Sequence, residues 1–358
     1  MRLAKKRGAR MPKRVSIIFP YRNSRHPVVR ENLTKVMENC VGERGEQWRW
    51  HKSIRKPVLV VNRDSMRRNP NEYEDFSSYL DCLGKRELLD RLDVVEVWSV
   101  DTCQMWLAGF GKIVDDEETA QKSKDGGRNG QPENSAQNPL VVLQVPGDLK
   151  RIGQFERFER ALYNLGRQVD DETRPLAIGD FVVRHENSKH LIDTYGTYPL
   201  LFNWFPEVAA KLKSFGIDRP RSEFIAVSFG FLKEALRKKK FAYEQTIALL
   251  IYALATEGKW TVGEESVGEI DDEGTERGFR EAVDQIERTE RVLKVLWREM
   301  KGKGASTGDG NEFEFDIDQF EDRDRRSTAI REAALVYLAN VLKVRRQDSG
   351  PKPPSGTP

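Results

Sequence analysis

The chain has 358 residues and contains few cysteines and histidines, which limits the kinds of site that it can hold. Its three cysteines, Cys40, Cys82 and Cys103, are odd in number and far apart, so they do not suggest a disulfide framework. Unpaired cysteines are typical of a reducing compartment, and we therefore expect a cytoplasmic protein. With four histidines and no Cys-X-X-Cys pair, the sequence predicts no structural zinc site.

Long apolar runs and several catalytic motifs are also missing. The longest apolar stretch, Ile247–Ala255, is far too short to span a membrane, and no signal-peptide core follows the first residues. No Gly-X-Ser-X-Gly or His-Glu-X-X-His motif is present, and no Gly-X-Gly-X-X-Gly follows a predicted strand. These absences argue against serine hydrolases, zinc proteases and dinucleotide-dependent enzymes.

Charge is distributed unevenly along the chain. Residues 1–14 carry seven Lys or Arg and no acid, whereas the net charge of the whole chain is only +3. The remainder is therefore slightly acidic, which argues against nucleic acid as a partner although a basic arm can bind one. We expect the arm itself to be disordered.

Patterns of buried strands and amphipathic helices alternate along the first half of the chain. Strands are predicted at Val15–Phe19, Val58–Val61, Val94–Trp98, Leu140–Val145 and Leu176–Arg184. Helical spacing is found at 27–41, 73–92, 104–121 and 155–165. This alternation predicts an α/β protein with a mostly parallel sheet flanked by helices.

Composition suggests four regions. We expect a basic disordered arm over 1–14, an α/β domain over 15–272, a helical extension over 273–345 and a disordered tail over 346–358. Inside the α/β domain, residues 122–138 are rich in glycine and polar residues and predict a mobile loop. The amphipathic helices of the extension could join copies of the chain into a homo-oligomer.

The most informative motif is the turn that follows the predicted strand at 140–145. It reads Pro146-Gly147-Asp148, and Gly147 allows backbone angles that would let the Asp148 carboxylate project from the strand tip. A carboxylate in such a place can bridge Mg²⁺ or Mn²⁺ to the oxygens of a diphosphate. An Asp here could equally cap a following helix, and both readings stay open.

Polar residues follow two other predicted strands. Pro20, Tyr21 and Arg22 come after the first strand, where open α/β sheets bind ligands, and Arg22 could hold a phosphate or simply end the strand. Arg184 and His185 end a later strand and could anchor an acidic or hydroxylated acceptor, although a lone histidine is more often structural.

Two glutamates are further candidates. Glu244 lies at the expected start of an apolar helix, where the helix dipole alone explains a carboxylate, but it could also orient an acceptor hydroxyl or act as a base. Glu223 lies in the segment 220–224 and belongs to the same group of candidates.

Taken in order, these segments resemble the GT-A glycosyltransferases over about Val15–Asp272. Ile18–Arg22 resembles the first strand of that family and its donor-side basic residue. Leu143–Leu149 stands where the family carries an Asp-X-Asp motif, of which only the second acid is present here. Phe181–His185 resembles the strand that ends in an acceptor-binding Arg-His pair.

The resemblance implies a transferase that moves a sugar from a nucleotide-diphosphate donor to a small hydroxylated or acidic acceptor, with Mg²⁺ or Mn²⁺ as cofactor. It implies Glu244 and Asp148 as catalytic residues, Pro20, Tyr21, Arg22 and Asp148 as donor-binding residues, Arg184, His185 and Glu223 as acceptor-binding residues, and Asp148 as the metal ligand. Because the Asp-X-Asp motif is incomplete, the alternative is a non-catalytic GT-A-fold binding or scaffold protein that has lost its metal site.

Overall fold

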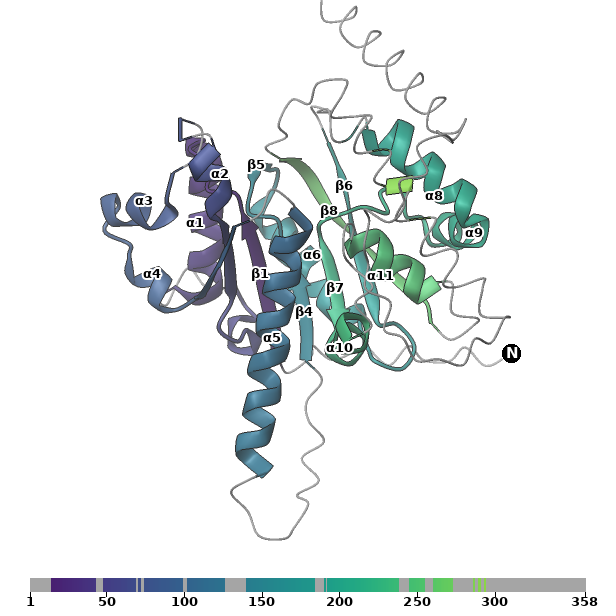
Figure 1. Ribbon diagram of the computed structural model, residues 1–358, viewed down its shortest axis with the longest axis horizontal. Helices are drawn as coiled ribbons and strands as arrows, with labels where there is room; N and C mark the ends of the chain where they lie inside the picture. Colours follow the sequence, from purple (N-terminus) through teal and green to yellow (C-terminus); the bar gives the residue numbers. More distant parts are fainter. Residues whose placement is uncertain are drawn as a thin grey trace, which may run out of the picture. The chain divides into compact units, whose positions relative to one another are not determined.

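The computed structural model describes residues 14–42, 48–68, 70–71, 74–98, 102–125, 140–183, 192–237, 245–254 and 260–272, with residues 190, 286, 289, 290 and 293 (Figure 1). The predictions made for Arg184, His185 and Glu244 lie outside the described residues. The same holds for the tail, nearly all of the basic arm and nearly all of the helical extension.

Packing divides the chain into two units. The first comprises Met1–Arg184 and Lys211–Glu273, and the second comprises His185–Ala210 and Gly274–Pro358. The second unit contains a π-helical turn η2 (Asp193–Thr197), which continues directly into α8 (Tyr198–Trp204), and α9 (Pro206–Phe215) contains the unit boundary.

The first unit is built on one sheet of eight strands in the order β3-β2-β1-β4-β7-β6-β8-β5. Their bounds are β1 (Arg14–Tyr21), β2 (Val58–Asn62), β3 (Asp93–Val97), β4 (Leu140–Gln144), β5 (Leu149–Ile152), β6 (Leu176–Val182), β7 (Ile225–Ser228) and β8 (Val262–Asp272). β1 to β4 are mutually parallel, as are β6 and β8, whereas β7 and β5 run antiparallel to their neighbours. The predicted α/β sheet flanked by helices is confirmed, with a mixed strand pattern.

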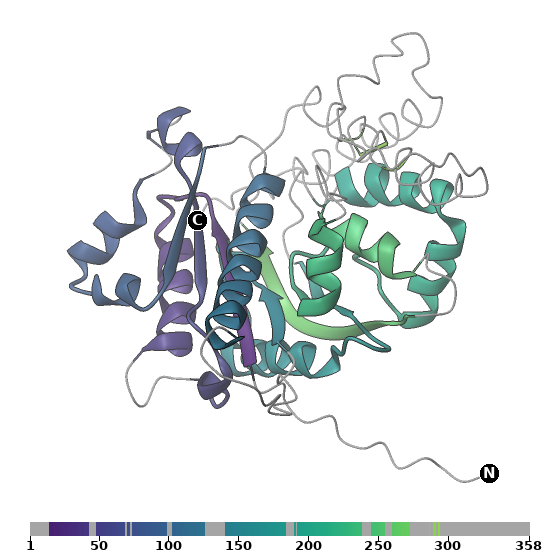
Figure 2. The same ribbon diagram turned by 60° about the horizontal axis from the view of Figure 1, so that its bottom comes forward.

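Helices cover both faces of this sheet (Figure 2). In the described residues of the first unit, the helices and a 3₁₀ turn are α1 (Pro27–Val41), η1 (His51–Ser53), α2 (Arg63–Arg68), α3 (Phe76–Cys82), α4 (Glu87–Asp90), α5 (Thr102–Asp125), α6 (Phe155–Gln168), α10 (Phe229–Arg237) and α11 (Gln245–Leu254). α1 and α6 pack on one face, and α5, α10 and α11 contact the strands from the other. Within the described part of the chain, no helix is long and apolar enough to cross a membrane.

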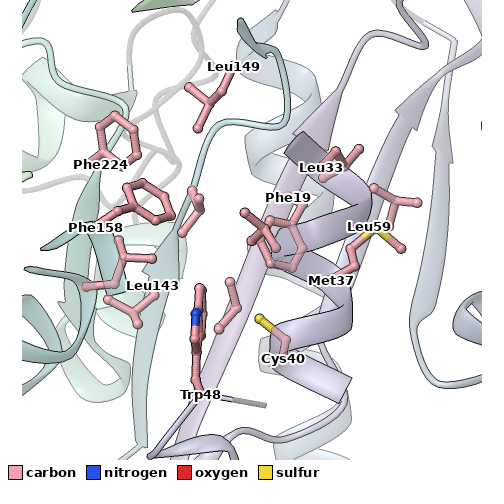
Figure 3. Packing of buried hydrophobic residues seen from close by; sticks show 14 of the residues in the cluster. Phe19, Leu33, Met37, Cys40, Trp48, Leu59, Leu143, Leu149, Phe158 and Phe224 are labelled. Atoms are coloured by element: carbon pink, nitrogen blue, oxygen red, sulfur yellow. The ribbon is translucent and has the colours of Figure 1, made fainter. Parts of the chain in front are cut away.

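Because helices cover both faces, alternate residues of each central strand enter different cores, which explains the continuous apolar runs. Phe19 and Leu143 pack against Met37 of α1 and Phe158 of α6 on one face (Figure 3). On the other face α5 comes very close, since a Cβ at Gly109 would lie 2.8 Å from the Ile18 side chain. Burial of this kind contributes about 25 cal/mol per Å² of apolar surface and is the main source of stability.

Several elements differ from the prediction. The expected helix over 73–92 is divided into α3 and α4 by Gly84, which adopts a φ of 66° that glycine tolerates at no steric cost. The strand β5 was not predicted. α5 continues to Asp125, so the first four residues of the loop predicted over 122–138 are helical, because charged residues such as Lys122 are good helix formers.

Candidate functional site at the carboxyl edge of the sheet

The strands β1 and β4 end side by side at the point where the winding of the sheet reverses. From β1 the chain continues outward to β2 and β3 on one side, whereas β4 lies on the other side. In open α/β sheets, ligands bind in the crevice outside the carboxyl ends of the strands at such a switch point. The side chains at this edge are therefore the first candidates for a site.

Backbone pairing holds the turn after β4 tightly against β1. Val145 N–H donates to Ile18 O (3.0 Å), and Gly147 N–H donates to Pro20 O (2.9 Å). A Cβ at Gly147 would lie only 2.6 Å from Pro20 O, so the close approach requires glycine. From the sequence, Gly147 was expected to adopt unusual backbone angles. This is wrong, because its φ is not positive, and its contribution is the missing side chain.

Asp148 follows this turn and lies beside Arg22. The Arg22 backbone N–H donates to Asp148 Oδ1 at 3.3 Å, and Arg22 Nε lies 4.0 Å from Asp148 Oδ2. Both side chains keep some exposure, 25% for Arg22 and 19% for Asp148, so a ligand can reach them. The structure thus brings together two residues that the sequence analysis placed in one site, and their roles in binding remain predictions.

The alternative reading of Asp148 as a helix cap is wrong. Asp148 is followed directly by β5, and the next helix, α6, has Gln154 at its N-cap position. The backbone on the far side of Asp148 is held by α1, because Asn32 Nδ2 donates to Leu149 O at 3.0 Å. The carboxylate is therefore presented from a fixed backbone.

The loop after Arg22 is equally well fixed. Ser24 O accepts hydrogen bonds from Tyr21 Oη and from Arg30 Nε, both at 2.7 Å. Arg30 also pairs with Glu74 at 2.9 Å, and Glu74 N–H donates to Asn23 O at 2.8 Å. Asn23 adopts a φ of 64°, a left-handed conformation that asparagine tolerates better than most residues. Tyr21, predicted to bind the donor, is fully buried, and its hydroxyl donates to the backbone of this loop.

The end of β2 adds polar groups that the sequence analysis missed. Asn62 and Asp64 are 4% and 7% exposed. Asn62 O accepts a hydrogen bond from Asn23 Nδ2, and Asn62 Oδ1 accepts one from the Asp64 backbone N–H, each at 3.0 Å. The signal was present, because Val58–Val61 is an apolar run followed at once by polar residues, as in β1.

Arg63 lies between these two residues and forms ion pairs with two neighbouring segments. It pairs with Asp75, the N-cap residue of α3, at 3.0 Å and with Glu96 of β3. Burial favours the neutral form of Asp75, but the hydrogen bonds from Arg63 and from Ser77 N–H outweigh it and lower the pKa of Asp75. The charge of Arg63 is thus matched by two carboxylates within the protein.

A different group of charges lies where β6 ends and β8 passes beside it. Burial raises the pKa of Asp180, and the nearby Asp218 adds to the rise, while the Phe181 N–H and Arg219 oppose it. Burial also raises the pKa of Glu264, with contributions from Asp180, Glu265 and Asp218. Asp180 was not predicted as a site residue, because it lies inside an apolar strand pattern.

Glu223, a predicted acceptor-binding residue, comes at the same end of the sheet. β7 is antiparallel to β6 with Ile225 opposite Ile178, so two residues earlier Glu223 is level with Asp180. Arg184 and His185 come shortly after the end of β6 but lie outside the described residues, as does Glu244 before α11. The structure therefore places three of the predicted site residues, Arg22, Asp148 and Glu223, at this carboxyl edge.

The fit of this edge to a metal ion depends on Asp148. Among the residues that the structure describes, no cluster of three or more His, Cys, Asp or Glu side chains is arranged to hold a metal. Mg²⁺ in nucleotide sites, however, usually keeps several waters and takes only one or two carboxylates together with phosphate oxygens. Asp148 fits this small donor set when a diphosphate supplies the other oxygens.

Comparison with known proteins gives structural matches alone, since no family model and no curated protein sequence matches the chain. The sequence resembles the GT-A glycosyltransferases, and the matching structures include a member of that class. It is glucosyl-3-phosphoglycerate synthase from Mycobacterium tuberculosis, solved with Mn²⁺, uridine diphosphate and phosphoglyceric acid. The TM-score is 0.48 and the identity 14%, over 79% of this chain and 78% of that chain.

A second match is the crystal structure of a mycobacterial protein, with a TM-score of 0.49 and 11% identity over 79% of this chain and 74% of that chain. Because these TM-scores lie below 0.5, the function proposed below depends on the strand order and the side chains of this chain itself.

Proposed function

We propose that the protein is a GT-A-type glycosyltransferase, which transfers a sugar from a nucleotide-diphosphate donor to a small hydroxylated or acidic acceptor. The observation that carries the proposal is the placement of Asp148 against Arg22 at the switch point between β1 and β4. A fixed carboxylate beside a guanidinium, both partly exposed, suits a ligand that carries phosphate and a divalent cation.

Each residue has a definite part in this proposal. Asp148 would hold Mg²⁺ or Mn²⁺, which neutralises the charge that develops on the departing diphosphate. Arg22 would contact the same diphosphate through its planar guanidinium. Glu223 would orient the acceptor together with Arg184 and His185. Glu244 would take the proton from the acceptor hydroxyl that attacks the sugar.

The alternative is a protein of the same fold that binds a nucleotide sugar without transferring it. The pairing between Asp148 and Arg22 favours this alternative to some extent, because the carboxylate already has a positive partner and a cation must compete with it. In that case Arg22 and neighbouring basic residues would hold the diphosphate without metal.

The test is a thermal-shift panel of UDP-, GDP- and ADP-sugars, with and without Mn²⁺, on the wild-type protein and on Asp148→Asn. A ligand that binds only the native state at 100 times its Kd adds about 2.7 kcal/mol to the free energy of unfolding, so even an inactive binder is detected. We expect a Mn²⁺-dependent shift that Asp148→Asn abolishes, with a change in ligand-free stability below about 1 kcal/mol.

Asp81→Asn is the matched control, because Asp81 is an exposed carboxylate on α3 whose partner is Arg86. If no nucleotide sugar shifts the wild-type protein, the proposed function is wrong. Equal shifts in wild type and Asp148→Asn would exclude the metal role and leave Arg22 as the diphosphate contact. Release of nucleoside diphosphate in the presence of hydroxylated acids then distinguishes a transferase from a binding protein.

A further inference from the structure

The strand β5, which follows the turn after β4, contains a β-bulge. Leu149 and Arg151 of β5 lie opposite two consecutive residues of β8, so Lys150 between them has no counterpart on that strand. Bulges are frequent beside functional sites, where they change the direction in which a side chain points. This bulge comes directly after the turn that positions the candidate site.

Burial along β5 shows on which side of the strand each residue lies. Leu149 belongs to the core cluster on the α1 and α6 face (Figure 3), and Ile152 packs against the same cluster. Regular alternation would place only one of these two residues in the core, because they are three positions apart. The bulge therefore leaves both Lys150 and Arg151 on the outer side of β5. Asp148 lies on this outer side as well, because it directly precedes Leu149 and successive residues of a strand point to opposite sides.

Lys150 is thus close to the pair formed by Asp148 and Arg22. Two residues of strand place the Cα atoms of Asp148 and Lys150 about 7 Å apart. Lys150 is partly exposed, and within the described residues its ammonium has no hydrogen-bond or ion-pair partner. Arg151 beside it, in contrast, is paired with Glu269 at 3.3 Å. A cation without a partner is therefore present at the same edge of the sheet as Asp148 and Arg22.

A bound diphosphate needs more positive charge than Arg22 alone provides. Arg22 lies against Asp148, so these two side chains together carry no net charge. A lysine ammonium is a compact positive charge with three donor hydrogens, and it is a common partner of phosphate in proteins. Lys150 supplies the positive charge that the pair lacks.

We propose that Lys150 binds the terminal phosphate of the nucleoside diphosphate, which is the phosphate that bears the sugar in the donor. This inference rests on the function proposed above. During transfer, the bond between the sugar carbon and the oxygen of this phosphate breaks, and its electron pair stays on the oxygen. The acceptor hydroxyl forms the new bond to the sugar carbon and gives up its proton. Lys150 stabilises the negative charge that remains on the phosphate.

A lysine in this strand also has a structural explanation, which the experiment must separate from phosphate binding. β5 is an edge strand of the sheet, and lysines on edge strands prevent pairing with other chains. A lysine with that role alone does not distinguish one ligand from another. A lysine bound to the terminal phosphate contributes to binding of a nucleoside diphosphate but not of the matching monophosphate. The ratio of these two affinities therefore tests the inference.

The experiment compares wild type with Lys150→Met and Lys150→Arg in the full chain. Kd values are measured by isothermal titration calorimetry for three pairs of probes, UDP and UMP, GDP and GMP, and ADP and AMP, with and without Mn²⁺. Lys35→Met is the matched control. Lys35 is exposed on α1, the helix that contacts β5, and its ammonium lies 4.5 Å from the centre of the Phe155 ring.

We expect Lys150→Met to lose at least tenfold in affinity for the nucleoside diphosphate that wild type binds. This is the size of effect expected of one hydrogen bond to a charged group. The affinity of the same variant for the monophosphate should stay within about twofold of wild type. Lys150→Arg keeps the positive charge and should retain most of the affinity for the diphosphate, and Lys35→Met should retain both affinities.

Diphosphate binding by Lys150→Met that equals that of wild type overturns the inference. An equal loss of affinity for the monophosphate also overturns it, because Lys150 would then not act on the terminal phosphate. So does an equal loss in Lys35→Met, which would show only a general effect of positive charge. If wild type binds none of the probes, the proposed function itself fails, and the inference fails with it.

Discussion

The two ends of the carboxyl edge differ in how their charges are balanced. Where β1 and β4 end, Asp148 lies against Arg22 on a backbone held from both sides. Where β6 runs beside β8, burial raises the pKa of both Asp180 and Glu264, with Asp218 adding to each rise and Asp180 adding to that of Glu264. One end thus holds a pair of opposite charges, while the other has carboxylates whose pKa values are raised.

The largest effect should come from breaking the backbone contact that positions Asp148. In Gly147→Ala the new Cβ would approach Pro20 O to 2.6 Å, so the turn after β4 must move. We expect a loss of about 1–3 kcal/mol in the free energy of unfolding and loss of the nucleotide-sugar shift. Urea unfolding and the thermal-shift panel measure these two quantities.

The control for this change is Gly111→Ala in α5, where a Cβ meets no atom within 4 Å. Since alanine favours helix, this variant should be unchanged or more stable by up to about 1 kcal/mol, with unaltered binding. If Gly147→Ala behaved like Gly111→Ala, the turn after β4 would not be the element that presents Asp148.

The next effect concerns the loop that follows Arg22. Arg30→Met removes the buried donor to Ser24 O and the partner of Glu74, and it should cost about 2 kcal/mol, as expected for hydrogen bonds to charged groups. Arg25→Met serves as control, because Arg25 lies 3.9 Å from the same glutamate but is 48% exposed, and its loss should cost less than about 0.5 kcal/mol. If urea unfolding gave equal losses of free energy for the two variants, burial would not explain the contribution of Arg30 to stability.

At the β6–β8 end, stability should depend on pH with a definite sign. Because folding raises the pKa of Asp180, the folded state binds more protons than the unfolded state, and stability falls as pH rises through the raised pKa. Asp180→Asn should therefore raise Tm at pH 7. The higher Tm of the variant should vanish below about pH 3.9, where the carboxyl of Asp180 is protonated in the unfolded state as well.

Asp170 provides the opposite case. Burial opposes its ionised form, but hydrogen bonds from Thr173, Arg174 and Glu172 prevail and lower its pKa. The ionised Asp170 therefore adds to the free energy of unfolding above about pH 3.9, and this contribution is lost as pH falls through the lowered pKa. Asp170→Asn should therefore lower Tm at pH 7. A lower Tm for both variants between pH 4 and pH 7 would show that Asp180 is not destabilised by its surroundings.

The smallest effect is the coupling between the two acids of that end. Because Asp180 contributes to the raised pKa of Glu264, removing either charge relieves the other. The effects of Asp180→Asn and Glu264→Gln on the free energy of unfolding should therefore be non-additive at pH 7. The double variant should gain about 0.5 kcal/mol less than the sum of the two single variants. A double-mutant cycle in urea unfolding measures the difference, and strict additivity would mean that Asp180 does not contribute to the raised pKa of Glu264.

The sequence by itself determined the elements that depend on local pattern. Apolar runs such as Val58–Val61 predict buried strands because both faces of a central strand are covered. The polar residues after them, Arg22 and Asp148, were recognised as site candidates because the carboxyl ends of parallel strands meet at one edge. The helix over 27–41 followed from its spacing in the same way and is observed as α1.

Only the tertiary structure decided the features that depend on contacts between distant segments. The insertion of antiparallel β7 between β4 and β6, the approach of Gly147 to Pro20 and the repulsion felt by Asp180 each join residues far apart in the chain.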